Sequence, residues 1–272
     1  MPLTLIISSH VAGSRVGGSA QALALGAFGI DAVAVPTVLF GRHPGWGAPG
    51  GGPVPVEIFE GMLEGVCDNG LFDLADLVLT GYFASAEQAV IAAEAARACP
   101  NAVIIVDPIM GDGGKGLYVS AEVADANEQE RAPIAHLFAP NAWEAERLTG
   151  IKIDGAPAAV AAARKLDRPA LISSVPCGAE IGVVYADPRG AWLATHRRLE
   201  QAPSGTGDLL TALFAAHLLD DISPEERLAR TVGGVALAVE AANEWQAPEL
   251  PIVALGARLK DEPAPVRVEQ IA

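Results

Sequence analysis

A short glycine-rich segment ahead of an apolar stretch offers the clearest chemistry in this sequence. Residues 202–208 are Ala-Pro-Ser-Gly-Thr-Gly-Asp, and an apolar run with helical spacing follows at once. Glycines let backbone N–H groups converge on one point, and the N-terminus of the following helix adds unpaired N–H groups and a positive partial charge. Such a site binds anions such as phosphate. Beside it, the carboxylate of Asp208 could take the proton from a hydroxyl that attacks a phosphoryl group.

The same segment has a purely structural interpretation. Asp208 can serve as the N-cap of a helix over residues 209–219, with Gly205 and Gly207 as turn residues. The segment alone leaves both interpretations open, so the rest of the chain has to decide between them.

Two further polar sites follow apolar, strand-like runs. Asp107 comes directly after the run 103–106, and open α/β sheets bind their ligands beyond the carboxyl ends of strands. Asn141 and Glu144 share one face at the start of a helical stretch, where an amide and a carboxylate could hold Mg²⁺ through water molecules. Both sites also have structural interpretations. Asp107 can close a turn before a proline, and Asn141 with Glu144 can form a capping box.

A third candidate turn lies near the N-terminus. Ser8-Ser9-His10 ends the first strand-like run, and glycines at positions 13, 17 and 18 lead into a helical stretch. This pattern indicates a loop that faces a ligand, although it matches no strict dinucleotide motif. Residues 111–116 come near a Walker A motif but lack its Lys-Ser/Thr ending.

The elements that must position these residues alternate along the chain. Strands are predicted over residues 3–8, 32–38, 77–80, 103–107, 137–139, 170–174, 181–186 and 191–196. Helices are predicted over residues 18–28, 55–69, 85–99, 120–130, 141–149, 157–166, 208–219 and 224–245. This alternation is typical of βαβ units, and predicts a mostly parallel central sheet with helices on both faces.

Two segments do not fit this alternation. The stretch 41–55 is rich in glycine and proline, and we interpret it as an active-site flap, with a plain surface loop as the alternative. The last dozen residues contain Pro263 and Pro265 and are predicted to form a loosely held tail.

Composition excludes several classes of partner. The net charge of −15 argues against binding to nucleic acid or to an anionic membrane. The three cysteines are scattered and odd in number, which favours reduced thiols over a disulfide framework. Neither a signal peptide nor an apolar run of about 18 residues is evident. A cytoplasmic protein without a membrane partner is therefore expected.

The order of the three polar sites resembles the ribokinase-like superfamily and, within it, the pyridoxal kinases. Residues 107–112 (DPIMGD) are similar to the family's DPVMGD segment, and Asn141-x-x-Glu144 is similar to the magnesium-associated NxxE motif. Residues 205–208 (GTGD) resemble the anion-hole and catalytic-base motif of the superfamily.

Three earlier segments resemble the vitamin B6 branch in particular. Residues 9–11 (SHV) with 16–20 (VGGSA) are similar to the opening SHV…VGNSA, residues 37–43 (TVLFGRH) to TVQFSNH, and residues 79–85 (LTGYFAS) to SGYLGS. The resemblance extends from residue 5 to about residue 240. The GTGD segment is specific to the superfamily, whereas the early segments carry the substrate assignment.

This resemblance implies a fold and an activity. The fold would be a Rossmann-type three-layer α/β sandwich, with one ribokinase-like kinase domain over residues 1–272. The activity would be ATP-dependent phosphorylation of the 5′-hydroxymethyl group of pyridoxal, with pyridoxine and pyridoxamine left open as further substrates. Mg²⁺ would accompany ATP, the need for a monovalent cation is left open, and the family suggests a homodimer.

Carried over position by position, the resemblance also implies roles for single residues. Asp208 would be the catalytic base, and the backbone of Gly205, Thr206 and Gly207 would form the anion hole. The vitamer would be bound by Ser9, Thr37, His43 and Tyr82. ATP would be bound by Asp107, Asp112, Tyr118, Glu144 and Ser173, and the metal ion would be held by Asp107, Asn141 and Glu144.

Some positions depart from the family pattern, and other functions stay open. Gly18 stands where the family usually has asparagine, and Trp46 lies in the region of a usual tyrosine. The preferred vitamer is therefore undecided. One alternative is a hydroxymethylpyrimidine kinase, although those enzymes often carry a cysteine at the position of Asp208. An alternative of another class is a non-catalytic protein that binds pyridoxal phosphate. The joint presence of Asp107, Glu144 and Asp208 argues against that alternative.

Overall fold

The computed structural model describes residues 1–199 and 202–272. Its strands are β1 (Leu3–Val11), β2 (Asp31–Phe40), β3 (Gly51–Pro53), β4 (Leu77–Thr80), β5 (Val103–Val106), β6 (Gly111–Asp112), β7 (Gly116–Leu117), β8 (Leu137–Phe138), β9 (Ala170–Cys177), β10 (Glu180–Asp187), β11 (Gly190–Arg197) and β12 (Arg267–Gln270). Its α-helices are α1 (Gly17–Gly26), α2 (Val56–Asp68), α3 (Leu71–Leu74), α4 (Ala86–Arg97), α5 (Ala121–Ala126), α6 (Ala142–Thr149), α7 (Ala156–Lys165), α8 (Thr206–Leu218), α9 (Pro224–Glu244), α10 (Ile252–Leu255) and α11 (Arg258–Asp261). Shorter helical turns are η1 (Pro44–Trp46), the π-helical η2 (Asn127–Arg131) and η3 (Ala132–Ile134).

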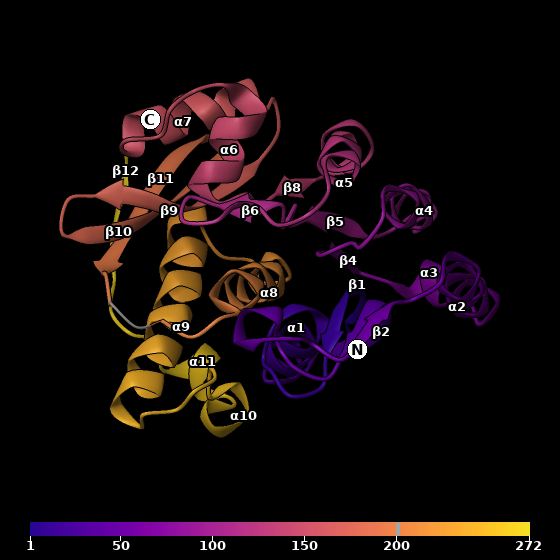
Figure 1. The fold of residues 1–272 in the computed structure, drawn as a ribbon. Helices are drawn as coiled ribbons and strands as arrows, with labels where there is room; N and C mark the ends of the chain where they lie inside the picture. The colour runs from indigo at the N-terminus through magenta and orange to yellow at the C-terminus, as the bar shows by residue number, and fades with distance from the viewer. Residues whose placement is uncertain (200–201) are drawn as a thin grey trace.

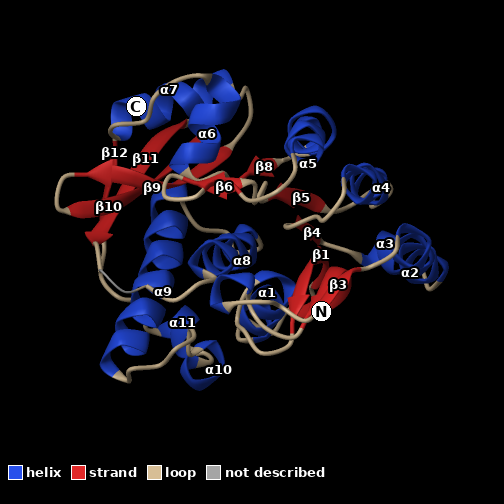
Figure 2. Cartoon of the chain, viewed as in Figure 1, coloured by secondary structure: helices blue, strands red, loops and turns tan. Residues whose placement is uncertain are grey.

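One ten-stranded sheet runs through these residues, in the order β12-β11-β10-β9-β8-β5-β4-β1-β2-β3. The strands from β9 to β2 in this order are parallel to their neighbours. Antiparallel strands extend both ends, with β3 beside β2, and β10, β11 and β12 beside β9. Helices cover both faces (Figures 1 and 2). The predicted α/β class with a mostly parallel central sheet is therefore confirmed.

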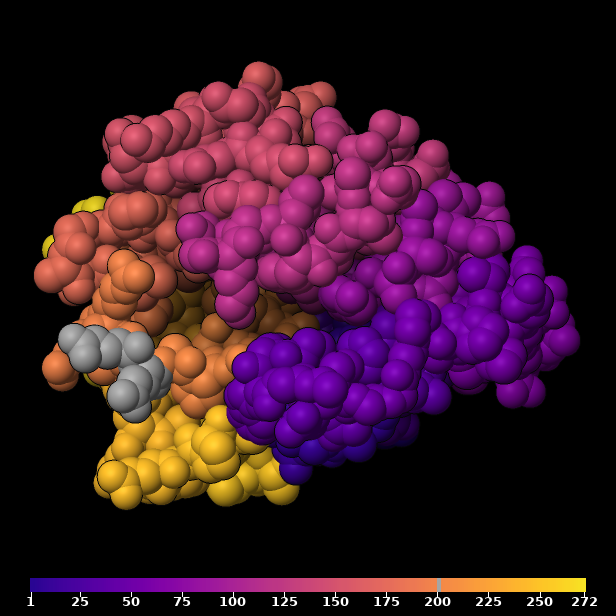
Figure 3. All heavy atoms as spheres, viewed as in Figure 1, coloured from indigo at the N-terminus to yellow at the C-terminus, as the bar shows by residue number. Residues whose placement is uncertain are grey.

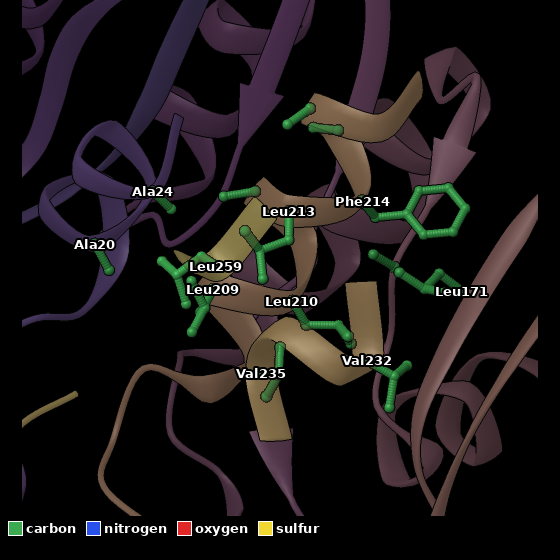
Figure 4. Close-up of a cluster of buried hydrophobic side chains, with 14 of the residues drawn as sticks. Ala20, Ala24, Leu171, Leu209, Leu210, Leu213, Phe214, Val232, Val235 and Leu259 are labelled. Carbon is green, nitrogen blue, oxygen red and sulfur yellow. The ribbon is translucent and has the colours of Figure 1, made fainter. Parts of the chain in front are cut away.

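The alternation of side chains along β1 explains the layers. Ile6 lies in the core on one face of the sheet, whereas Leu5 and Ile7 lie in the core on the other face. The first core also contains α1, α8 and α9 side chains, and Figure 4 shows Ala24, Leu213 and neighbouring apolar side chains packed together there. Helix α8 is buried continuously from Leu209 to His217. It therefore runs through the interior, with its N-terminus at the carboxyl ends of the parallel strands.

The structure differs from the sequence prediction at the C-terminus. The segment expected to be a loose tail contains β12, which pairs antiparallel with β11 and places Trp192 opposite Gln270. Its sequence, Arg-Val-Glu-Gln, has no apolar run that would signal a strand. The backbone hydrogen bonds to β11 stabilise it instead.

The glycine- and proline-rich stretch 41–55 is also more ordered than its composition suggests. It contains η1 and the edge strand β3, which pairs with β2 through the opposed residues Phe40 and Gly51. Its function as a flap stays a prediction.

Candidate functional site

The carboxyl ends of adjacent parallel strands bring the predicted site residues together. In the sheet, Ile7 of β1 is opposite Thr80 of β4, and Thr80 is opposite Val106 of β5. The residues that follow these strands therefore emerge at one edge of the sheet. The face drawn in Figure 3 is hollowed between the indigo N-terminal part, the magenta middle part and the orange part of the chain.

The anion hole lies at the N-terminus of α8. Gly205 is the N-cap, with φ of 93°, and no side chain of the described residues caps the helix. Apart from the N–H of Asp208, which faces its own carboxylate, the N–H groups of the first turn are therefore available to an anion. A Cβ at position 205 would lie 2.1 Å from the carbonyl oxygen of Arg15, so only glycine fits there. The interpretation of Asp208 as the N-cap is wrong, because Asp208 is the third residue of the helix.

The half-buried carboxylate of Asp208 lies beside this hole, with its Oδ1 atom out of contact with solvent. Its Oδ1 accepts no hydrogen bond from the described residues. Burial raises its pKa to about 6, while the backbone N–H groups of Gly17 and of Asp208 itself act in the opposite direction. The carboxylate is thus largely charged at neutral pH and has an oxygen available for a proton. These are the properties required of a general base.

Gly17 is tightly placed between this base and the end of β1. Its φ is 57°, and a Cβ there would lie 2.1 Å from Oγ of Ser9. Ser9 is itself buried, with 8% of its surface exposed. The predicted vitamer ligand Ser9 and the predicted base Asp208 therefore lie on either side of one glycine.

Asp107 is joined to α8 by a contact between distant parts of the chain. Thr211 donates a hydrogen bond from Oγ1 to Oδ2 of Asp107 over 3.1 Å. Burial raises the pKa of Asp107 well above its usual range, and the charges of Glu144 and Asp208 raise it further. Asp107, Glu144 and Asp208 therefore form one acid cluster, in which Asp107 and Glu144 are buried and Asp208 is half-buried. A divalent cation would relieve the repulsion between them.

Asn141 and Glu144 form the capping box that their spacing allows. Asn141 Oδ1 accepts from the N–H of Glu144 over 2.9 Å, and Glu144 Oε2 accepts from the N–H of Asn141 over 2.8 Å. Glu144 Oε1 also accepts from the N–H groups of Met110 and Gly111 over 2.6 and 3.3 Å. Burial raises the pKa of Glu144 to about 7, against the lowering effect of these N–H groups. Much of the hydrogen-bonding capacity of this predicted metal pair is thus used within the protein.

The arrangement of these acids is not that of a preformed metal cage. Within residues 1–199 and 202–272, no three or more His, Cys, Asp and Glu side chains are grouped so that they could hold a metal ion. Their role toward Mg²⁺ stays a prediction.

The residues predicted to contact the vitamer have different environments. The side chain of Thr37 is fully buried, and its hydroxyl donates to the carbonyl oxygen of Tyr82 over 2.7 Å. Thr37 therefore holds the backbone of Tyr82 in place. His43 Nδ1 accepts from the N–H of Gly45 over 3.1 Å. Burial, and then the charge of Lys115, lower the pKa of His43, so its imidazole is neutral at pH 7.

The residues predicted to contact ATP surround the acid cluster. Asp112 Oδ1 accepts from the N–H groups of Gly114 and Lys115 and so shapes the β6–β7 hairpin. Tyr118 is 45% exposed, and partial burial followed by the charges of Glu144, Asp107, Asp112 and Asp208 raises the pKa of its phenol. Ser173 pairs with Asn141 in an isolated β-bridge.

A cavity of about 500 Å³ opens beside the anion hole. It lies between Trp46 of the 41–55 stretch, the segment 202–204 that precedes α8, and the C-terminal end of α9. Its other lining residues are Ala242, Asn243, Gln246, Ala247 and Pro248. This cavity offers a space for a ligand next to the segment that precedes α8.

Sequence reasoning missed two residues of this site. Thr211 lies three positions after Asp208, on the same face of α8, so helical spacing could have indicated it. Arg131 is fully buried and donates to Thr80 and to the backbone of Asp107. Nothing in its neighbourhood in the sequence pointed to those contacts.

Comparison with known proteins agrees with this geometry. A family model described as phosphomethylpyrimidine kinase matches residues 22–252. The chain is 36% identical over 231 residues to a pyridoxine/pyridoxal/pyridoxamine kinase of Bordetella avium, covering 80% of this chain and 78% of the relative. It is 31% identical over 281 residues to a pyridoxal kinase of Corynebacterium diphtheriae, covering 98% and 99%.

Solved structures share the fold. A pyridoxal kinase from Leishmania donovani in complex with ADP and pyridoxine superposes with a TM-score of 0.91 at 24% identity and covers 99% of both chains. A pyridoxal kinase from Staphylococcus aureus in complex with ADP has a TM-score of 0.85 at 20% identity, covering 100% of this chain and 99% of that one. Among the described helices, none combines the length and the apolar character needed to cross a membrane. The resemblance found in the sequence is confirmed. The chain belongs to the phosphomethylpyrimidine kinase family, and its similar relatives include pyridoxal kinases.

Proposed function

We propose that this protein is an ATP-dependent pyridoxal kinase that phosphorylates the 5′-hydroxymethyl group of pyridoxal, and also that of pyridoxine and pyridoxamine. The observation that carries the proposal is the half-buried carboxylate of Asp208 next to the uncapped first turn of α8. A base and an anion hole side by side are what transfer of a phosphoryl group to a hydroxyl needs. The kinases named among the relatives support this choice of substrates.

Each predicted site residue has its own role in the proposed reaction. Asp208 accepts the proton of the 5′-hydroxyl as the oxygen attacks the terminal phosphate. The N–H groups of residues 205–207 stabilise the charge on the transferred phosphoryl group, because they are already oriented before the reaction. Ser9 and Tyr82 orient the vitamer, and the flap 41–55 excludes water from the site.

As the resemblance implies, the nucleotide would lie beside Asp112, Tyr118 and Ser173. The cavity lined by Trp46 and residues 202–204 adjoins the start of α8 and would offer it further space. Mg²⁺ bound with ATP would neutralise phosphate charge. Asp107 is the direct ligand we favour, because three backbone N–H groups already bind the carboxylate of Glu144. Asn141 and Glu144 would contribute through water molecules. A monovalent cation, a homodimer, a cytoplasmic location and a single kinase domain over residues 1–272 remain parts of the proposal that rest on the resemblance.

A second candidate is a hydroxymethylpyrimidine kinase, which the description of the matching family model favours. An assay of ADP release with Mg-ATP and each of pyridoxal, pyridoxine, pyridoxamine and hydroxymethylpyrimidine separates the two. We expect turnover with at least pyridoxal and a phosphate ester as product. Turnover confined to hydroxymethylpyrimidine would establish the second candidate. Tight binding of pyridoxal phosphate without any turnover would instead indicate a non-catalytic binding protein.

A further inference from the structure

The turn between Asp107 and Gly111 is strained. Ile109 has φ of 41°, in the left-handed region that a β-branched residue rarely adopts. Such a conformation is unfavourable and persists only where the surroundings hold it. The turn connects Asp107 of the acid cluster to the β6–β7 hairpin, so its conformation determines where both lie.

Two buried side chains of opposite charge hold the two ends of this turn. Before it, Nη2 of Arg131 donates to the carbonyl oxygen of Asp107 over 2.9 Å and to Oγ1 of Thr80 over 2.7 Å. After it, Oε1 of Glu144 accepts from the N–H groups of Met110 and Gly111 over 2.6 and 3.3 Å. The strained residue lies between these two anchors.

Arg131 has no exposed surface, which is unusual for a cation. The π-helical turn η2 carries it inward, its guanidinium lies 4.4 Å from the ring centre of Phe83, and Nη1 donates to Oδ1 of Asn127. Burial of a charge is costly unless hydrogen bonds compensate it. A methionine or leucine would fill the same space without that cost. The several N–H donors of the guanidinium are therefore what the site gains from having an arginine at position 131.

We propose that Arg131 is a positioning residue for phosphoryl transfer. With Glu144 it clamps the strained turn 107–111, and this keeps Asp107 against α8 and the β6–β7 hairpin over the acid cluster. The inference rests on the proposed kinase function, because its catalytic consequence is measured as turnover. Its structural consequence, the fixed turn, can be measured without turnover.

The test compares two buried arginines. Arg227 resembles Arg131, because it is buried, lies 6.0 Å from the ring centre of Phe214 and donates to the carbonyl oxygens of His217 and Ile222. It belongs to α9 and contacts the C-terminal end of α8, away from Asp208. We expect Arg131→Met and Arg227→Met both to lower the thermal midpoint. At a temperature where both variants are folded, only Arg131→Met should lower kcat, by about 10- to 100-fold, with a smaller change in KM.

Two further variants examine the clamp directly. Arg131→Lys keeps the charge but has a single nitrogen, so kcat should fall between that of wild type and that of Arg131→Met. Ile109→Gly removes the strain at this position, because glycine adopts positive φ readily. Added to Arg131→Met, it should restore part of kcat. Equal kcat for Arg131→Met, Arg227→Met and wild type would overturn the proposal.

Amide hydrogen exchange gives the reading that does not depend on activity. In the ligand-free protein, Arg131→Met should accelerate exchange at the N–H groups of Met110 and Gly111, whereas Arg227→Met should not. If Arg131→Met fails to fold, the same measurement on Arg131→Lys decides. Unchanged exchange at both amides overturns the clamp. Absence of kinase activity in wild type, with accelerated exchange in the variant, would refute the proposed function and leave the clamp intact.

Discussion

Replacing Asp208 by asparagine should stabilise the fold while it removes turnover. Burial raises the pKa of this carboxyl from its ordinary value of 3.8 to about 6. The raised pKa means that folding favours the protonated form. Protonation of Asp208 therefore contributes to the stability of the fold. The contribution is complete below pH 3.8 and is lost as the pH rises through about 6. At neutral pH the folded protein therefore carries a charge at a cost of about 3 kcal/mol, from 1.36 kcal/mol for each of the roughly two pKa units.

Asparagine has nearly the same shape without the charge. We expect the thermal midpoint of Asp208→Asn at pH 7 to rise by about 5–10 °C. Its kcat for pyridoxal should fall by several orders of magnitude, while ATP still binds in a calorimetric titration. The stability gain should shrink as the pH is lowered below about 6.

Asp187 offers a matched control with the opposite sign. Burial alone would raise the pKa of Asp187, but hydrogen bonds from Arg189 and Tyr185 outweigh it and lower the pKa. Asp187→Asn should therefore destabilise the protein at pH 7 and leave kcat nearly unchanged. An Asp208→Asn variant that is less stable than wild type, or that retains kcat, would contradict the account of this site.

Three other perturbations test neighbouring parts of the site. Gly205→Ala should lower both kcat and the thermal midpoint, because its Cβ would meet the carbonyl oxygen of Arg15. Gly207→Ala has open space around its Cβ, so both quantities should fall less when the two variants are compared by melting and turnover. The profile of kcat against pH should fall tenfold per unit below about 6 as the predicted base takes up a proton, and a flat profile down to pH 5 would exclude it. Thr37→Val leaves the carbonyl of Tyr82 without its donor, so KM for pyridoxal should rise more than KM for ATP.

The sequence was most informative where a run of residues has one dominant signal. The strand 77–80 was predicted with its observed ends, because four apolar or β-branched residues stand between Asp76 and Gly81. The helix predicted over 120–130 was only half right. Regular α-helix ends at Ala126, a π-helical turn follows, and Pro133 lacks the N–H to continue a helix.

The sequence could not predict the strands that are stabilised only by pairing with a neighbouring strand. β3 is Gly-Gly-Pro, with neither β-branched nor aromatic residues, and exists through its ladder with β2. β12 depends in the same way on β11. A local pattern cannot reveal a strand whose stability comes from a partner far away in the chain.

The same distinction applies to the site. Asp208 and the Asn141–Glu144 pair stand in local patterns, and the sequence located them. The contacts of Arg131 reach 51 residues back to Thr80 and 24 residues back to Asp107, so no spacing predicted them. The buried state of Thr37 also depends on its tertiary neighbour Tyr82.

The position of Gly17 has a consequence for altering this protein. Its N–H faces the carboxylate of Asp208, and its α-carbon lies against Ser9, so a single residue separates the two predicted chemical functions. Any side chain introduced there to reshape the vitamer pocket would also move the base. Substitutions meant to change the acceptor are better made at Tyr82 and His43. The loop between β1 and α1 should then stay unchanged, because Gly17 at its end contacts both Ser9 and Asp208.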